Sequence, residues 1–164
     1  GVLIVSEDMN HPPQQLTASD WPYGDIVMVE RYVAGRELTC GVMGGKPLDV
    51  IEIISTDHKF YDYDAKYAPG GSKHILPAEI LPNIYQSIQI LSSKAHHALG
   101  CRGVSRADFR LHEKSDGSHD LICLEVNTQP GMTPTSLVPE MAAHIGLSFK
   151  DLVCWMVEDA SCGR

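Results

Sequence analysis

The residues with the clearest potential for chemistry are two carboxylates, Asp108 and Glu125. They lie in two segments of alternating apolar and polar residues, SRADFRLH and DLICLEVN. Between the segments stands Asp116-Gly117, and an Asp-Gly pair is a strong signal for a two-residue β-hairpin turn. A hairpin centred on this pair places Asp108 directly opposite Glu125. Because carboxylates that face each other across two strands repel, a divalent cation between them would stabilise the pair.

The same hairpin places Arg106 opposite Asn127, and the period of two puts these residues on one face with the carboxylates. Hard cations such as Mg²⁺ prefer oxygen ligands, and Asn127 would add an amide oxygen. The ordinary alternative is a solvated hairpin face whose charges have no special role. The opposite face is predicted to be uniformly apolar and to consist of Ala107, Phe109, Leu111, Ile122, Leu124 and Val126.

The segment that follows the second strand, EVNTQPGMT, leads through a Pro-Gly turn into a predicted helix from about 134 to 144. Backbone N–H groups at the start of a helix point outward and can hold an anion. Gly131 permits close approach of the backbone to a ligand, and Thr133 is the predicted N-cap. An ordinary strand–turn–helix connection is the alternative. A metal site beside Arg106 and an anion pocket would together suit phosphoryl or acyl transfer.

Other patterns along the chain predict the elements that must position these groups. IVMVERYVAG is typical of a buried strand that ends near Glu30 and is followed by a connection to Gly35. RELTCGVMGG and PLDVIEIIS predict two strands joined around residues 44–46. A helix is expected to begin at Pro82 and to end before Gly100, with an apolar stripe formed by Ile84, Ile88, Leu91, Ala95 and Ala98. Residues 55–78 have no sustained periodicity and predict a long loop, which in a compact domain is usually functional or mobile.

A last helix is predicted to begin after Ser148, where Asp151 three residues later resembles a capping box, and to end near Ala160. Its predicted core residues are Phe149, Leu152, Val153, Met156 and Val157.

Composition places the chain among globular proteins of one domain, with 164 residues of which 43% are hydrophobic. The formal net charge of −8 argues against a broad nucleic-acid interface, which needs a basic surface. Five cysteines without metal-ligand spacing indicate thiols in a reducing cytoplasm. No apolar run is long enough to span a membrane, and no signal peptide is visible. The chain begins at Gly1 without Met, so we expect a piece of a longer protein.

Several motifs together resemble the D-alanine–D-alanine ligases, a family of ATP-grasp carboxylate–amine ligases. They are VERYVAGRELTCGVMG, YDYDAKY, GVSRADFR and LEVNTQPGMTPTSLVPEMAAHIGLSFKDLV, and they cover nearly the whole chain. The resemblance implies an α/β (α+β) fold, with the mostly antiparallel sheet of the C-terminal ATP-grasp portion flanked by helices. Residues 1–164 would form that portion, and the N-terminal domain and the phosphate loop of the central domain would be absent from this chain.

The resemblance also implies roles for individual residues, beginning with nucleotide and metal. Glu30, with Arg31, Tyr32 and Val33, looks like the adenine-binding segment, and Glu37 like the residue that binds the ribose hydroxyls. Asp108, Glu125 and Asn127 look like the ligands of two Mg²⁺ (or Mn²⁺) ions, with Glu125 bridging them.

On the side of the substrate, Arg106 and the Gly131 amide look like oxyanion donors, while Ser136 and the Leu137 amide look like the clamp for the carboxylate of the second D-alanine. Lys66 and Tyr67 look like members of a mobile loop over the site. In related depsipeptide ligases this tyrosine is commonly replaced, so Tyr67 favours D-alanine over D-lactate as acceptor.

The implied activity is the ATP-dependent ligation of two D-alanines through an acyl phosphate, for peptidoglycan precursors. The resemblance further implies a cytoplasmic homodimer that acts without nucleic acid or membrane. Two alternatives stay open. One is another ATP-grasp ligase, with D-lactate or another amino acid as acceptor. The other is a catalytically incomplete fragment that binds nucleotide or metal without turnover.

Overall fold

The computed structural model describes residues 3–5, 9–55 and 72–162, which fall into two compact units, Gly1–Val33 and Ala34–Arg164. The first unit contains one short helix, α1 (Gln14–Thr17), and an edge-to-face pair of Trp21 and Tyr23 with ring centroids 4.9 Å apart. The indole nitrogen of Trp21 donates to the Gly24 carbonyl at 2.8 Å.

The predicted strand that ends near Glu30 is not formed. Residues 26–34 have no regular secondary structure, and the side chains of Ile26 and Val29 are 90% and 87% exposed. An isolated extended segment leaves its backbone groups without the ladder that stabilises a strand. Among the described residues no neighbouring strand supplies that ladder, so apolar composition alone was a poor guide here.

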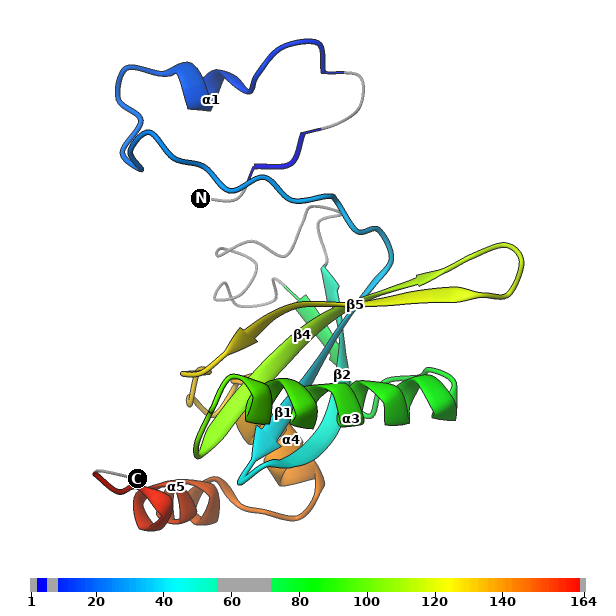
Figure 1. Ribbon diagram of the computed structural model, residues 1–164. Helices are drawn as coiled ribbons and strands as arrows, with labels where there is room; N and C mark the ends of the chain where they lie inside the picture. Colours follow the sequence, from blue (N-terminus) through cyan, green and yellow to red (C-terminus); the bar gives the residue numbers. More distant parts are fainter. Residues whose placement is uncertain (1–2, 6–8, 56–71, 163–164) are drawn as a thin grey trace. The chain divides into compact units, whose positions relative to one another are not determined.

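The second unit is built on a five-stranded antiparallel sheet in the order β3-β2-β1-β4-β5, as the mostly antiparallel expectation required (Figure 1). The strands are β1 (Arg36–Met43), β2 (Lys46–Ser55), β3 (Ser72–Ile75), β4 (Val104–Glu113) and β5 (His119–Asn127). The helices are α3 (Pro82–Ala98), α4 (Leu137–His144) and α5 (Phe149–Asp159). The predicted connection of β1 and β2 around residues 44–46 is confirmed, since Met43 pairs with Lys46.

Each face of the sheet has its own apolar core, with α3 on one side and α4 on the other (Figure 1). The core under α3 is made of Leu38, Cys40, Val50, Ala78, Ile84, Ile88, Ala107, Phe109 and Leu111. The core under α4 is made of Leu48, Ile51, Ile53, Val104, Leu137, Val138, Met141, Ala142 and Leu152. The sheet is therefore the middle layer of a three-layer α+β arrangement.

Helix α3 begins at Pro82 as predicted, but its buried stripe differs from the expected one. The buried positions are Ile84, Ile88, Ser92 and His96, whereas Leu91 is 39% exposed. The two polar members of the stripe are accommodated by hydrogen bonds, because the Ser92 hydroxyl donates to the Ile88 carbonyl at 2.8 Å and the His96 ring contacts the Ser105 hydroxyl at 2.7 Å. Polar groups whose hydrogen bonds are satisfied can occupy core positions. The prediction of a purely apolar stripe was therefore wrong for the second half of the helix, where Ser92 and His96 are the buried residues.

The hairpin of β4 and β5 has the predicted pairs, although it reaches them by a different route. Its loop contains three residues, Ser115 to Gly117, closed by the Lys114 N–H to Ser118 carbonyl bond of 2.8 Å. Gly117 has the left-handed φ of +81° that such loops require. A β-bulge at Leu124 then shifts the register by one residue, so that Phe109 faces Cys123 while Asp108 faces Glu125.

The bulge corrects the predicted apolar face. Ile122 faces Arg110, on the polar side of the sheet, and Leu124 is 43% exposed. Leu121 takes the predicted place of Ile122, since it faces Leu111 and packs with Val126 against the core under α3. An extra residue in one strand inverts the inward–outward alternation that follows from a period of two.

The two C-terminal helices also differ in part from those predicted from the sequence. Helix α4 begins at Leu137, so its N-cap is Ser136 and not Thr133. In α5 the cap is as predicted, with the Asp151 N–H donating to the Ser148 hydroxyl at 3.2 Å. Of the five predicted core residues of α5, Leu152 alone is fully buried, and Phe149, Val153 and Val157 are exposed. None of the described helices is both long enough and apolar enough to cross a membrane.

Replacing Phe109 by Ala should lower the free energy of unfolding by about 3–5 kcal/mol, the usual cost of truncating a buried aromatic residue. Phe109 is wholly inaccessible, whereas Leu124 is 43% exposed. Leu124→Ala is therefore the matched control, and it should change stability by at most about 0.5 kcal/mol. Urea unfolding of both variants measures the difference. Equal losses would contradict the register described above.

Candidate functional site

Polar side chains gather on the α4 side of the sheet, where β1, β4 and β5 run side by side. Across β1 and β4, Glu37 pairs with Arg110 and Thr39 with Asp108. Across β4 and β5, Asp108 pairs with Glu125 and Arg106 with Asn127. Residues paired in this way share a face, so three strands deliver these seven side chains to one surface. At the other end of that face, α4 covers the sheet through Met141, whose sulfur accepts the Gly41 N–H at 3.1 Å.

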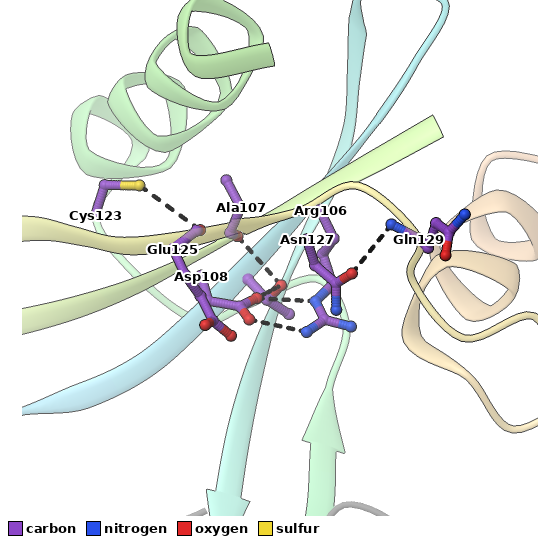
Figure 2. Close-up of polar contacts among 8 residues, drawn as sticks. Arg106, Ala107, Asp108, Cys123, Glu125, Asn127 and Gln129 are labelled. Atoms are coloured by element: carbon purple, nitrogen blue, oxygen red, sulfur yellow. Dashed lines mark hydrogen bonds and ion pairs between the residues drawn. The ribbon is translucent and has the colours of Figure 1, made fainter. Parts of the chain in front are cut away.

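Asp108 is held by a two-pronged ion pair with Arg106 (Figure 2). The Nε of Arg106 donates to Asp108 Oδ1 at 2.9 Å, and its Nη2 donates to Oδ2 at 2.8 Å. The Thr39 hydroxyl adds a third bond, to Oδ1, at 2.6 Å. Both charged residues are only 8% exposed. A buried charge needs a partner and hydrogen bonds to offset its loss of water, and Asp108 has both.

Glu125 differs from its neighbour because it is exposed. Its carboxylate has no hydrogen bond or ion pair with the described part of the chain, and it extends from β5 to the same side as Asp108 (Figure 2). The pair predicted to repel is therefore relieved on one side only, by Arg106. The thiol pKa of Cys123 is raised by partial burial and by the nearby charges of Asp108 and Glu125.

Asn127 ends β5 and orients the segment that follows. Its Oδ1 accepts the backbone N–H of Gln129 at 3.1 Å, which fixes the amide and turns the chain out of the sheet (Figure 2). Pro130, which follows Gln129, is buried. Asn side chains commonly bond to the backbone two residues on, which is why they favour turns.

The chain from Gly131 to Ser136 is closed by contacts between Thr133 and Ser136. The Thr133 N–H donates to the Ser136 hydroxyl at 3.0 Å, the two hydroxyls lie 2.8 Å apart, and the Ser136 N–H donates to the Thr133 carbonyl at 2.9 Å. A Cβ atom on residue 131 would lie 2.9 Å from the Ser136 hydroxyl. A side chain at position 131 would therefore displace the Ser136 hydroxyl, and the two residues predicted to contact substrate are neighbours.

The donor set of the sheet face fits a hard divalent cation. Asp108, Glu125 and Asn127 offer carboxylate and amide oxygens, which Mg²⁺ and Mn²⁺ accept. One carboxylate is already balanced by Arg106, and the exposed Glu125 carries the negative charge that a cation would neutralise. Within the described ranges no three His, Cys, Asp or Glu side chains gather closely enough to form a metal cage. Among the described residues, a cation here would therefore use the Asn127 amide oxygen as well as the two carboxylates.

The remaining predicted residues have different outcomes. Glu37 lies on the same face as Asp108 and its carboxylate is 3.2 Å from the Arg110 guanidinium. Glu30, Arg31, Tyr32 and Val33 belong to the first unit, and their adenine-binding role stays a prediction.

Lys66 and Tyr67 fall outside the described residues. Leu137 opens α4 directly after Ser136.

Two residues of this surface, Thr39 and Arg110, were not singled out from the sequence. Each lies directly across from a predicted site residue, Thr39 from Asp108 and Arg110 from Glu37. The signal was present in the alternation of β1, where Glu37 and Thr39 are two residues apart with the apolar Leu38 between them. Recognising it required the knowledge that β1 pairs with β4, across more than sixty residues of sequence.

Comparison with known proteins connects this surface with one family. The family model described as the D-ala D-ala ligase C-terminus matches residues 10–158. The D-alanine–D-alanine ligases of Sinorhizobium medicae (strain WSM419) and Rhizobium meliloti (strain 1021) are each 67% identical over all 164 residues. Those residues make up 53% of either relative, so the chain spans about half the length of the curated relatives it matches.

Solved structures agree with the sequence comparison. The D-alanine–D-alanine ligase of Bacillus anthracis complexed with ATP superimposes with a TM-score of 0.63 and 28% identity, over 79% of this chain and 39% of that one. The VanG D-Ala:D-Ser ligase of Enterococcus faecalis gives a TM-score of 0.61 and 34% identity, over 77% of this chain and 36% of that one. The chain thus belongs to the D-alanine–D-alanine ligase family and corresponds to its C-terminal part.

Proposed function

We propose that the complete protein that carries this chain joins two D-alanines at the expense of ATP, as a step in making peptidoglycan precursors. The observation that carries the proposal is the Asp108–Glu125 pair, with Arg106 and Asn127 beside it, on one face of the sheet. That arrangement stands in a chain 67% identical to D-alanine–D-alanine ligases. The proposed reaction needs no side-chain nucleophile and depends on stabilisation of charge.

The proposed reaction has two steps. The carboxylate of the first D-alanine takes the terminal phosphoryl group of ATP and becomes an acyl phosphate, with release of ADP. The amine of the second D-alanine then attacks the acyl carbon, loses a proton, and expels phosphate. Negative charge develops on the acyl oxygen during the attack, so fixed positive or N–H groups aimed at that oxygen lower the barrier.

The residues of this chain have distinct parts in that reaction. Arg106, oriented by its two bonds to Asp108, and the Gly131 N–H would stabilise the developing oxyanion. Ser136 and the Leu137 N–H would bind the carboxylate of the acceptor at the start of α4, where helix N–H groups favour anions. Glu37 would bind the ribose, and Glu30 to Val33 the adenine.

Two Mg²⁺ or Mn²⁺ ions held by Asp108, Glu125 and Asn127 would supply positive charge to the phosphates of ATP. Glu125 is the more accessible of the two carboxylates, because it is exposed whereas Asp108 is paired with Arg106. This exposure supports Glu125 as a ligand of the ions. Lys66 and Tyr67 would close over the bound nucleotide. The complete protein would act as a cytoplasmic homodimer, and the chain alone, which spans about half the length of its curated relatives, would be inactive.

The acceptor could be an amino acid other than D-alanine. The 34% identity to a D-Ala:D-Ser ligase makes D-serine one alternative acceptor, and D-lactate, a hydroxy acid, is another. The products that the complete protein forms at neutral pH from D-alanine alone, from D-alanine with D-serine and from D-alanine with D-lactate, identified alongside release of ADP, separate these possibilities. We expect turnover with D-alanine alone as both donor and acceptor. Formation of D-alanyl-D-lactate without D-alanyl-D-alanine would overturn the proposal.

Asp108→Ala and Glu125→Ala should each abolish D-alanine-dependent release of ADP, because each removes a ligand for the cations that neutralise the phosphates. The control is Asp120→Ala, which removes a carboxylate of β5 that is bound to the exposed Lys114 at 2.7 Å. That variant should keep normal turnover. Near-normal activity in either of the first two variants would refute the metal assignment.

Arg106→Ala should lower kcat by about 10²-fold or more, the usual effect of removing one oxyanion donor. Because the guanidinium also fixes Asp108, the dependence of rate on Mg²⁺ is measured alongside kcat. Arg106→Lys keeps the charge but not the two-pronged geometry, and it should recover part of the loss. An unchanged kcat in Arg106→Ala would remove Arg106 from the proposed chemistry.

Gly131→Ala should raise KM for the acceptor D-alanine by about tenfold or more, because a displaced Ser136 hydroxyl would lose its proposed bond to the acceptor carboxylate, and a bond to a charged group contributes about 1.5–3 kcal/mol. The new methyl group would lie 2.9 Å from the Ser136 hydroxyl and would push that side chain away. KM for ATP is the internal control and should change little. A rise confined to KM for ATP would place Gly131 on the nucleotide side instead.

A further inference from the structure

Thr39 is a polar side chain in the middle of β1, and it is completely buried. On either side of it in the sheet lie Ile51 of β2 and Asp108 of β4. A valine would fill nearly the same volume at such a position, and β-branched residues suit strands. The hydroxyl is therefore explained by what it contacts and not by packing.

The Thr39 hydroxyl has two acceptors within reach. It lies 2.6 Å from Asp108 Oδ1 and 3.2 Å from the Ala107 carbonyl. A hydroxyl has a single proton to donate, and bonds to an ionised acceptor are shorter and stronger than bonds to a neutral one. The proton is consequently directed to the carboxylate, and the carbonyl contact is secondary.

The bonds to Asp108 are distributed unequally between its two oxygens. Oδ1 receives the Thr39 hydroxyl at 2.6 Å and Arg106 Nε at 2.9 Å, whereas Oδ2 receives Arg106 Nη2 at 2.8 Å. A carboxylate oxygen accepts about two hydrogen bonds. Within the described part of the chain, Oδ1 is thus saturated, and Oδ2 keeps the remaining capacity of this carboxylate.

We propose that Thr39 is a positioning residue for the metal site: its hydroxyl holds Asp108 so that Oδ2 is the oxygen presented to a divalent cation. This inference rests on the proposed function, because it presupposes that Asp108 is a metal ligand. Arg106 alone leaves Asp108 able to rotate with the guanidinium, since both charged groups are side chains. Thr39 adds a bond from a different strand and fixes the carboxylate relative to β1.

The test is Mn²⁺ binding to the complete protein in the presence of a non-hydrolysable ATP analogue, followed by electron paramagnetic resonance. Thr39→Val removes the hydroxyl and keeps the branched shape, and it should weaken Mn²⁺ binding about tenfold, as expected for a lost bond to a charged group. Thr39→Ser restores the hydroxyl, and its affinity should lie within about twofold of the unsubstituted protein. Rescue by serine is a result that a merely structural threonine would not give.

The matched control is Ser92→Ala, which removes another buried hydroxyl, on the α3 side of the sheet. Its Mn²⁺ affinity should be unchanged even if its melting temperature falls. If Thr39→Val does not fold, Thr39→Ala and Thr39→Ser carry the comparison, because they differ only by the hydroxyl.

Two outcomes would overturn the proposal, and they are distinguishable. If the unsubstituted protein binds no Mn²⁺ with the nucleotide analogue, the proposed metal site fails and the role of Thr39 fails with it. If the unsubstituted protein binds Mn²⁺ and Thr39→Val binds it equally well, the metal site stands and the positioning role is refuted.

Discussion

The ion pair between Arg106 and Asp108 is the interaction on which the polar face of the sheet depends. Two charged side chains of one strand are almost fully buried there, and neither could remain so alone. Their pairing lets Asp108 occupy a buried position directly opposite Glu125, so one carboxylate is fixed while its neighbour stays exposed. Asp108 is held in place before any ligand arrives, which lowers the cost of binding.

The architecture around the pair divides one sheet face into two regions with different tasks. Helix α4 seals one end with apolar side chains, and the strands leave their polar residues at the other end. The same helix begins at Leu137, directly after Ser136, so a single packed element both covers the core and supports the predicted acceptor site. Substitutions in the core under α4 would therefore also shift Ser136, because that core fixes the position of the helix on the sheet.

Much of this could be predicted from the sequence, because local alternation and turn residues are strong signals in a hairpin. The facing pairs Asp108–Glu125 and Arg106–Asn127 are confirmed. The prediction assumed a two-residue loop and no bulge, and these two errors compensated for each other. Asp-Gly can close a two-residue or a three-residue loop, and nothing local reveals a bulge at Leu124. Thr39 and Arg110 were missed because the pairing of distant strands such as β1 and β4 is decided by packing. The prediction of a strand in the apolar segment from Ile26 was wrong because local composition does not reveal whether a partner strand is present.

The bulge at Leu124 and the three-residue loop compensate for each other in the register of this hairpin. With the chain at its present length, three loop residues without the bulge would set Glu125 opposite Ala107 and turn its carboxylate into the core under α3. The bulge with a two-residue loop would shift the pairing by the same amount and set Glu125 opposite Phe109. Either slipped pairing would place a charge among apolar side chains, which is costly. The hairpin is thus protected against slippage, because its charges stay on the polar face only when the two irregularities occur together or are both absent.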